Sequence, residues 1–171
     1  MIFRHRLNRG TLTNRAVAYI KQSKFKEALQ DCEQALFINP KFSKAHIRAY
    51  TCYTNQGMLD KAKTALDMAI ELGDETAKNQ MPRIEDLLKS ESYAVKALEK
   101  KEYREAISYL KRLMDACVDS VKHTCLYLEA LVASNPNDMT DCIQFTTKVQ
   151  NKFIQMPEFL YWRGRILMYN G

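Results

Sequence analysis

The chain has 171 residues, of which 46% are hydrophobic and 27% are charged, with only five glycines and four prolines. This composition is typical of a soluble, mostly helical protein and argues against a β-sheet. No apolar run approaches the roughly 18 to 20 residues that span a bilayer, and the basic start, Met1 to Thr13, lacks the apolar segment of a secretory signal. We therefore expect a protein of the cytoplasm, or also of the nucleus, without a membrane partner.

A 34-residue periodicity organises the first half of the chain. Counted from Arg9, small residues fall at offsets 20 and 27 and bulkier apolar residues at offsets 11, 17 and 24, and a shift of 34 keeps the class at five of seven positions. Small residues let two antiparallel helices approach closely, and bulky residues fill the space beside them. Turns at residues 22–24 and 55–57 would close two hairpins. The compared positions are Ala16, Tyr19, Phe25, Ala28, Cys32, Ala35 and Pro40, and Tyr50, Tyr53, Leu59, Ala62, Leu66, Ala69 and Asp74.

This pattern resembles the tetratricopeptide repeat (TPR), a helix-turn-helix unit of 34 residues. Further frames start near Leu87, His123 and Pro157, and the last of them is truncated. The resemblance implies an all-α, right-handed superhelical solenoid of antiparallel helix hairpins, with about four and a half repeats. The residues that fit these later frames are Ala94, Ala97, Tyr103, Ala106, Leu110, Leu113, Ala130, Ala133, Met139, Cys142, Val149, Leu160, Gly164 and Leu167.

An insertion divides the array into two predicted submodules. About ten extra residues lie within 74–86, directly after Gly73, which is a suitable helix C-cap. We expect Glu75 to Met81 to form a helix that covers the second repeat, and Pro82 to start or kink the next helix. The first submodule would then span residues 1–81 and the second residues 82–171. In the fourth repeat, a turn at 134–138 would let Asp138 cap the following helix.

Two cations and an asparagine are expected on one groove-lining surface. In stacked helix hairpins, equivalent positions of successive repeats lie about 10 Å apart. Asn14 and Arg48 occupy such equivalent positions, and Lys44 lies four residues before Arg48 on the same helix face. An amide donor, a point charge and a planar guanidinium together suit a carboxylate. Val17 and Thr51 would form the adjoining lining of the groove.

These residues resemble the carboxylate clamp of chaperone-binding TPR domains. The matching stretches are "NRA" at 14–16 and "KAHIR" at 44–48. In that family the motifs hold the terminal carboxylates of the Hsp70 or Hsp90 tail, so the resemblance implies a co-chaperone adaptor with such a partner. A further Lys and Asn that the family places one repeat earlier have no counterpart in these residues, so the clamp is partial as given. Either the sequence is a fragment of a longer chain, or the start has been lost from the gene product, or binding is weak. With "YWRGRILMYN" at 161–170, the chain most resembles the TPR region of J-domain-bearing co-chaperones, although no "HPD" of a J domain occurs.

Other functions have less support from the sequence. His5, His46 and His123 are far apart, and no phosphate loop or nucleophile motif occurs, so we expect no enzyme and no cofactor. Five cysteines at unequal spacing indicate reduced thiols and no zinc site. The net charge of +6 favours nucleic acid or an acidic partner, but acids alternate with the bases even in the densest basic stretch, 96–112. Nucleic-acid binding is therefore not expected.

Two alternatives stay open at this stage. A general TPR scaffold would bind internal peptide segments or helices of other proteins, and it would be indifferent to a free C-terminal carboxylate. In the second submodule no second clamp is present, and Trp162 at a groove position is either packed core or a contact for a partner.

Overall fold

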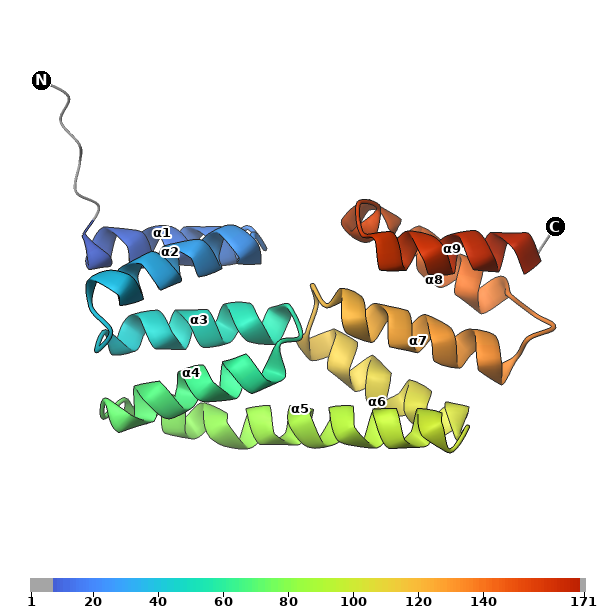
Figure 1. Cartoon of the computed structure of the whole chain (residues 1–171), viewed down its shortest axis with the longest axis horizontal. Coiled ribbons are helices and arrows are strands. Elements are labelled where there is room, and N and C mark those ends of the chain that lie inside the picture. The colour runs from blue at the N-terminus through green and yellow to red at the C-terminus, as the bar shows by residue number, and fades with distance from the viewer. Residues whose placement is uncertain (1–7, 170–171) are drawn as a thin grey trace, which may run out of the picture. The chain divides into compact units, whose positions relative to one another are not determined.

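The computed structural model describes residues 8–169, and all regular structure within them is α-helical (Figure 1). Helices begin at residues 9, 43 and 157, where the repeat pattern predicted them to begin. The helix that was expected to begin near residue 123 begins two residues earlier, at Val121. The all-α prediction is confirmed. The helices are α1 (Arg9–Lys21), α2 (Phe25–Ile38), α3 (Ser43–Asn55), α4 (Leu59–Glu71), α5 (Glu75–Glu99), α6 (Tyr103–Ala116), α7 (Val121–Ser134), α8 (Thr140–Phe153) and α9 (Pro157–Tyr169).

Four of the helix ends share one hydrogen-bonding pattern. After α1, α3, α4 and α5, a residue with positive φ lets two consecutive backbone N–H groups bond back to the last turn, as in a Schellman motif. Glycine supplies the positive φ at Gly57 and Gly73, as expected for the C-cap at Gly73, whereas Ser23 and Lys101 adopt it despite their side chains. The predicted turns at 22–24 and 55–57 are therefore confirmed, with one shared geometry.

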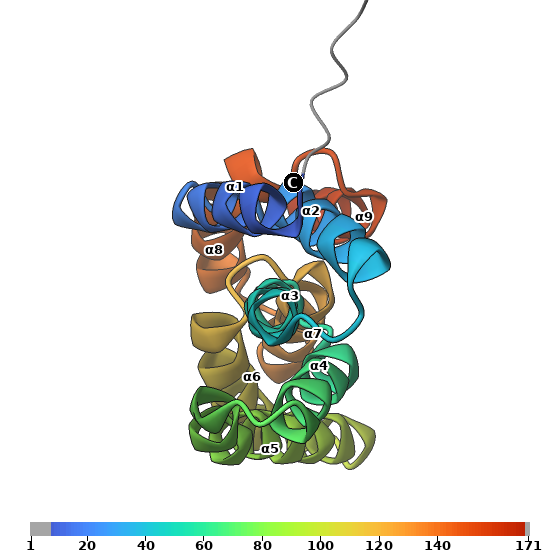
Figure 2. The same cartoon turned by 90° about the vertical axis from the view of Figure 1, so that its left-hand side faces the viewer.

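The small residues of the repeat pattern are the closest points of the hairpins. The small residues Ala16, Ala28 and Ala35 have no exposed surface, and neither have Ala62 and Ala69 one repeat later. The bulkier Cys32 and Leu66 beside them are also fully buried. Complete burial of an alanine means that the neighbouring helix lies directly against its Cβ. Figure 2 views unit 1 along its helices and places α3 between the α1–α2 hairpin and α4.

The chain contacts divide it into two compact units, Met1–Asp86 and Leu87–Gly171. The insertion does form a helix at Glu75 to Met81, but that helix does not stop at Pro82, because α5 continues through the proline to Glu99. Asp74 lies just before α5 and accepts hydrogen bonds from the Ser43 hydroxyl, the Thr76 hydroxyl and the Thr76 N–H, which together hold the pKa of its carboxyl below the usual value. The submodule boundary at 81/82 stays a prediction.

Unit 2 has its own apolar core, formed where α7, α8 and α9 meet. Its buried side chains are Leu128, Met139, Cys142, Phe153, Phe159 and Ile166. Asp138 accepts a hydrogen bond from the Thr140 N–H at the start of α8, as the turn at 134–138 predicted. Leu160 and Leu167 depart from the repeat pattern, since they are 44% and 52% exposed. Within residues 8–169, α9 packs against α7 and α8, and these two side chains lie outside that packing.

Four of the five cysteines are buried as free thiols and Cys125 is half-buried, in agreement with the expected reduced state. Within residues 8–169, no helix combines the length and apolar character needed to cross a bilayer. His5 lies outside the described residues.

Candidate functional site

Helix α3 presents two different surfaces on opposite sides of its axis. At 100° per residue, Lys44, Arg48 and Thr51 fall within an arc of about 60°, and His46, Ala49 and Tyr53 fall within a similar arc centred about 160° away. The first surface belongs to the predicted carboxylate site. The second lines a cavity, so one helix contributes to both candidate sites of unit 1.

The predicted carboxylate site is distributed over α1 and α3, which contact each other. Asn14 on α1 and Lys44 on α3 are both exposed. Neither side chain has an ion pair or hydrogen bond among the described residues. These two groups are therefore available to a ligand, as the groove geometry of the repeat predicts. Their binding of a carboxylate stays a prediction.

Arg48, the third polar residue of the predicted carboxylate site, is less exposed than Asn14 and Lys44. Its side chain is half-buried, and its Nη1 donates a hydrogen bond to the backbone carbonyl of Lys44 at 3.1 Å. Its Nε is buried without a hydrogen-bond partner in the described chain. The Cys52 thiol and burial raise the pKa of the Cys32 thiol, and the positive charge of Arg48 opposes that rise. Arg48 thus lies near the core of the first hairpins and keeps unused donor capacity.

The two lining residues of the predicted site are less exposed than its polar members. Val17 and Thr51 are both half-buried, and the Thr51 hydroxyl donates to the Ile47 carbonyl at 3.2 Å. Because the hydroxyl is satisfied within its own helix, Thr51 presents mainly its methyl group to the groove. Their role as the lining of a binding groove stays a prediction.

The arginine of the "NRA" stretch has a structural partner that the sequence did not reveal. Arg15 makes two hydrogen bonds to Asp31 on α2, from Nε to Oδ2 at 2.7 Å and from Nη2 to Oδ1 at 2.5 Å. The Asp31 side chain is only 4% exposed, whereas that of Arg15 is 45% exposed. This bidentate pair ties α1 to α2 and removes Arg15 from the candidate site.

Replacement of Arg15 by alanine should therefore lower the melting temperature more than replacement of Asp31 by alanine. The Arg15→Ala variant leaves a buried carboxylate without its partner, whereas Asp31→Ala leaves a guanidinium that water can solvate. We expect Asp31→Ala to cost within about 1 kcal/mol. Thermal unfolding followed by circular dichroism compares the two, and equal losses would argue against the pair as the source of the effect.

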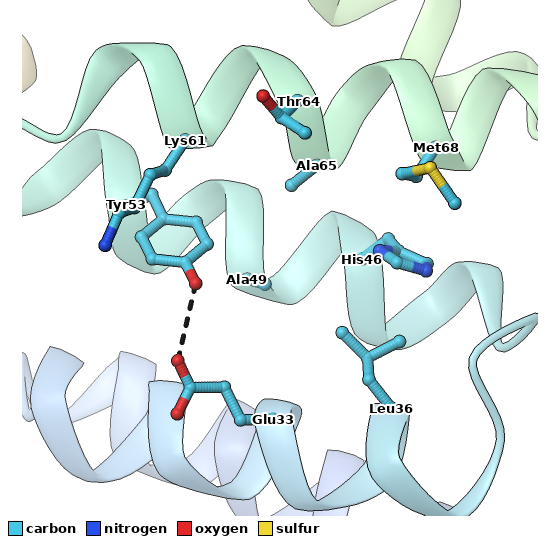
Figure 3. Close-up of a pocket in the computed structure, with 9 residues that line it drawn as sticks. All are labelled: Glu33, Leu36, His46, Ala49, Tyr53, Lys61, Thr64, Ala65 and Met68. Atoms are coloured by element: carbon cyan, nitrogen blue, oxygen red, sulfur yellow. Dashed lines mark hydrogen bonds between the residues drawn. The ribbon is translucent and has the colours of Figure 1, made fainter.

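The opposite surface of α3 borders an apolar cavity of about 250 Å³, which α2 and α4 complete (Figure 3). Leu36, Ala65 and Met68 contribute apolar walls, and His46 donates from Nε2 to the Pro40 carbonyl at 2.8 Å. At the other end the Tyr53 hydroxyl donates to Glu33 at 3.4 Å. Burial, followed by the charge of Glu33, raises the pKa of Tyr53, so this hydroxyl is a proton donor near neutral pH.

Unit 2 contains two larger cavities between α7 and α9, which sequence analysis approached only through Trp162. The first measures about 490 Å³ and the second about 350 Å³. Trp162 and Glu129 line both of them. Trp162 is half-buried and packs against the core of unit 2, as the first alternative drawn from the sequence expected, and its contact with a partner stays a prediction.

A buried carboxylate–histidine pair joins α5 to α7 in unit 2. His123 has no exposed surface, and its Nε2 lies 2.8 Å from Oε1 of Glu91, which also accepts from Lys122 Nζ at 2.7 Å. Burial alone would raise the pKa of Glu91, but the hydrogen bonds from His123 and Lys122 outweigh it and lower that pKa. The sequence signal was the separation of about one repeat, which makes residues of successive first helices neighbours.

Consecutive helix hairpins with grooves and cavities between them define a helical-repeat protein, a class whose surfaces receive segments of other proteins. Residues 11–42 match the family model of the tetratricopeptide repeat. This match identifies residues 11–42 as a tetratricopeptide repeat, and the helix hairpins that follow continue the same all-α architecture. A solved structure has the same fold, since 94% of this chain aligns with 50% of the crystal structure of the P58(IPK) TPR domain, at a TM-score of 0.68 and 19% identity.

Curated relatives of the chain include TPR co-chaperones. It is 29% identical over 100 residues to the Hsp70/Hsp90 co-chaperone CNS1 of Saccharomyces cerevisiae, covering 58% of this chain and 26% of that protein. It is 22% identical over 143 residues to DnaJ homolog subfamily C member 3 of Bos taurus, covering 80% of this chain and 28% of that protein. The chain therefore spans about a quarter of the length of these relatives.

Proposed function

We propose that the chain acts as a co-chaperone adaptor that binds the acidic C-terminal tail of Hsp70 or Hsp90 through Asn14, Lys44 and Arg48. The observation that supports this most directly is the unused donor capacity at one groove, because Lys44 has no acidic partner and Arg48 Nε has no partner among residues 8–169. The name of the yeast relative, an Hsp70/Hsp90 co-chaperone, supports the choice of partner. In this role the chain would be non-enzymatic and would work in the cytoplasm or nucleus.

Each of the three polar residues has a distinct part in the proposed site. Lys44 would supply a mobile point charge, Asn14 an amide N–H, and Arg48 a guanidinium that turns outward from the Lys44 carbonyl to meet the ligand. Charge-assisted hydrogen bonds contribute roughly 1.5 to 3 kcal/mol each. For these three residues by themselves, we expect a dissociation constant between about 10 µM and 1 mM.

Binding should require a free C-terminal carboxylate on the ligand. In calorimetric titrations with an acidic peptide of the chaperone tail sequence, amidation of its C-terminus should weaken binding at least tenfold, because it removes the charge that the site recognises. A Lys44→Ala, Arg48→Ala double variant should lose at least tenfold in affinity for the peptide with the free C-terminus. A Lys26→Ala variant is the matched control, since Lys26 is an exposed cation on α2.

Equal binding of the free and amidated peptides would refute the carboxylate site. It would favour the general scaffold, in which the groove binds internal segments and Lys44 and Arg48 are ordinary surface charges. Loss of binding in the Lys26→Ala control as well would point to nonspecific attraction between a basic protein and an acidic peptide.

A further inference from the structure

We propose that the cavity of about 490 Å³ between α7 and α9 binds an arginine side chain from an extended segment of a partner protein. Its walls combine apolar side chains with two carboxylates that approach from different helices. Val121, Leu126, Met156 and Trp162 supply the apolar surface, and Glu129 on α7 and Glu158 on α9 supply the charge. This site lies wholly in unit 2 and does not depend on the carboxylate site of unit 1.

The two carboxylates of this cavity lack a cation of their own. Neither Glu129 nor Glu158 forms an ion pair with any residue in 8–169. Lys122 also lines the cavity, but its Nζ already lies 2.7 Å from Oε1 of Glu91. Burial, and after it the negative charge of Glu158, raise the pKa of the Cys125 thiol to about 11, so the carboxylate of Glu158 acts on the interior of this cavity. An incoming cation would complete the charge balance.

The aromatic wall favours arginine over lysine as that cation. A guanidinium can stack on an indole while its fork donates to two carboxylates, whereas an ammonium forms a more compact, strongly hydrated charge. A guanidinium already lies over this indole in the second cavity, where Arg165 is 5.3 Å from the centre of the Trp162 ring. Arg165 lines only the second cavity, so the first cavity has no such internal arginine.

The second cavity indicates a peptide segment rather than a free cation. It shares Trp162 and Glu129 with the first cavity and adds apolar surface from Val132, Pro136 and Met139. Along α7 and α9 the lining residues of the two cavities are displaced by roughly five to seven positions, or about 8 to 10 Å. An extended chain advances by about 7 Å in two residues, which is close to this distance, and side chains two apart point the same way. The fitting pattern is arginine followed two residues later by an apolar side chain.

Trp162 gives a direct readout of this site, because it is the only tryptophan in the sequence. The probe is the blocked peptide acetyl-Gly-Arg-Ser-Leu-Gly-amide, which has no terminal carboxylate and so cannot use the site of unit 1. Titration into the intact chain should shift the indole N–H resonance of Trp162 in a saturable manner. Replacing the arginine by citrulline, a neutral side chain of the same shape, should weaken binding about tenfold.

Variants of the chain separate this site from general attraction between charges. Glu129→Gln and Glu158→Gln should each lower the affinity for the arginine peptide about fivefold and leave the affinity for the citrulline peptide unchanged. Glu99→Gln is the matched control, since Glu99 is exposed and does not line the cavity, and it should have no effect. Equal affinity for the arginine and citrulline peptides, or an unchanged Trp162 resonance at saturating peptide, would overturn the proposal.

Discussion

Replacing Phe159 by alanine should destabilise unit 2 by about 3 to 5 kcal/mol, the largest loss that we expect from one side chain. The Phe159 ring has no exposed surface and lies 5.9 Å, centre to centre, from the ring of Phe153. It belongs to the cluster in which α7, α8 and α9 meet, so its removal leaves a cavity with walls from several helices. Rigidly positioned walls cannot collapse into such a space, and both transfer energy and packing contacts are lost.

Chemical denaturation followed by Trp162 fluorescence measures this loss, since the single tryptophan reports on unit 2. Leu167→Ala on the same helix is the control, because Leu167 is 52% exposed and should cost no more than about 0.5 kcal/mol. Similar losses in both variants would contradict the packing of α9 described here, since they would place its other face in the core.

The repeat periodicity predicted most of the helix packing from the sequence. Positions with a size requirement, such as Ala28, Cys32 and Ala62, are fully buried, because a helix hairpin closes only where one helix has no bulk. The same pattern was wrong at Leu160 and Leu167, which are exposed. Periodicity reports which face of a helix is apolar, but burial also needs a neighbouring element over that face.

The helix across Pro82 illustrates a local rule overruled by packing. Proline removes one backbone donor and disfavours a helical residue before it, so the sequence suggested a start or a kink. In α5 the buried residues Ala77 and Ile84 flank Pro82 one heptad apart, and Leu87 continues the same stripe. Pro82 itself is exposed. Burial of residues on both sides of the proline offsets the lost hydrogen bond. This burial depends on tertiary packing, so the local sequence around Pro82 does not predict it.

Side-chain partners were the least predictable part of the candidate sites. The position of a residue within its repeat predicts where its backbone lies, and it therefore indicated that Asn14 and Lys44 belong to neighbouring helices. It did not reveal that Arg15 pairs with Asp31 or that Arg48 turns back to the Lys44 carbonyl, because a long side chain can reach several partners from one backbone position. The two units therefore differ in charge. Among residues 8–169, Lys44 and Arg48 of unit 1 have no acidic partner, and Glu129 and Glu158 of unit 2 have no basic partner.

Within residues 8–169, the His123 ring of unit 2 has one hydrogen-bond partner, the carboxylate of Glu91, and its Nδ1 has none. Glu91→Ala should therefore destabilise unit 2 by about 2 to 3 kcal/mol, because it leaves both ring nitrogens of a fully buried histidine without acceptors or donors. Glu91 is itself 14% exposed, so the loss should stay below that of a fully buried ion pair. Glu91→Gln keeps a hydrogen-bonding oxygen and should cost less than half as much.

The pH dependence of this cluster follows from the lowered pKa of Glu91. A carboxyl whose pKa is lower in the folded state than in the unfolded chain stabilises the fold fully above the unfolded value, about 4.3, and loses that contribution as pH falls through the folded value. Denaturation at a series of pH values from 7 to 3 should therefore show a gap between the native chain and Glu91→Gln that is constant above pH 5 and closes below it. A gap that widens on acidification would mean that the charge of Glu91 destabilises the fold, and the carboxylate–histidine–lysine cluster would then owe its position to packing alone.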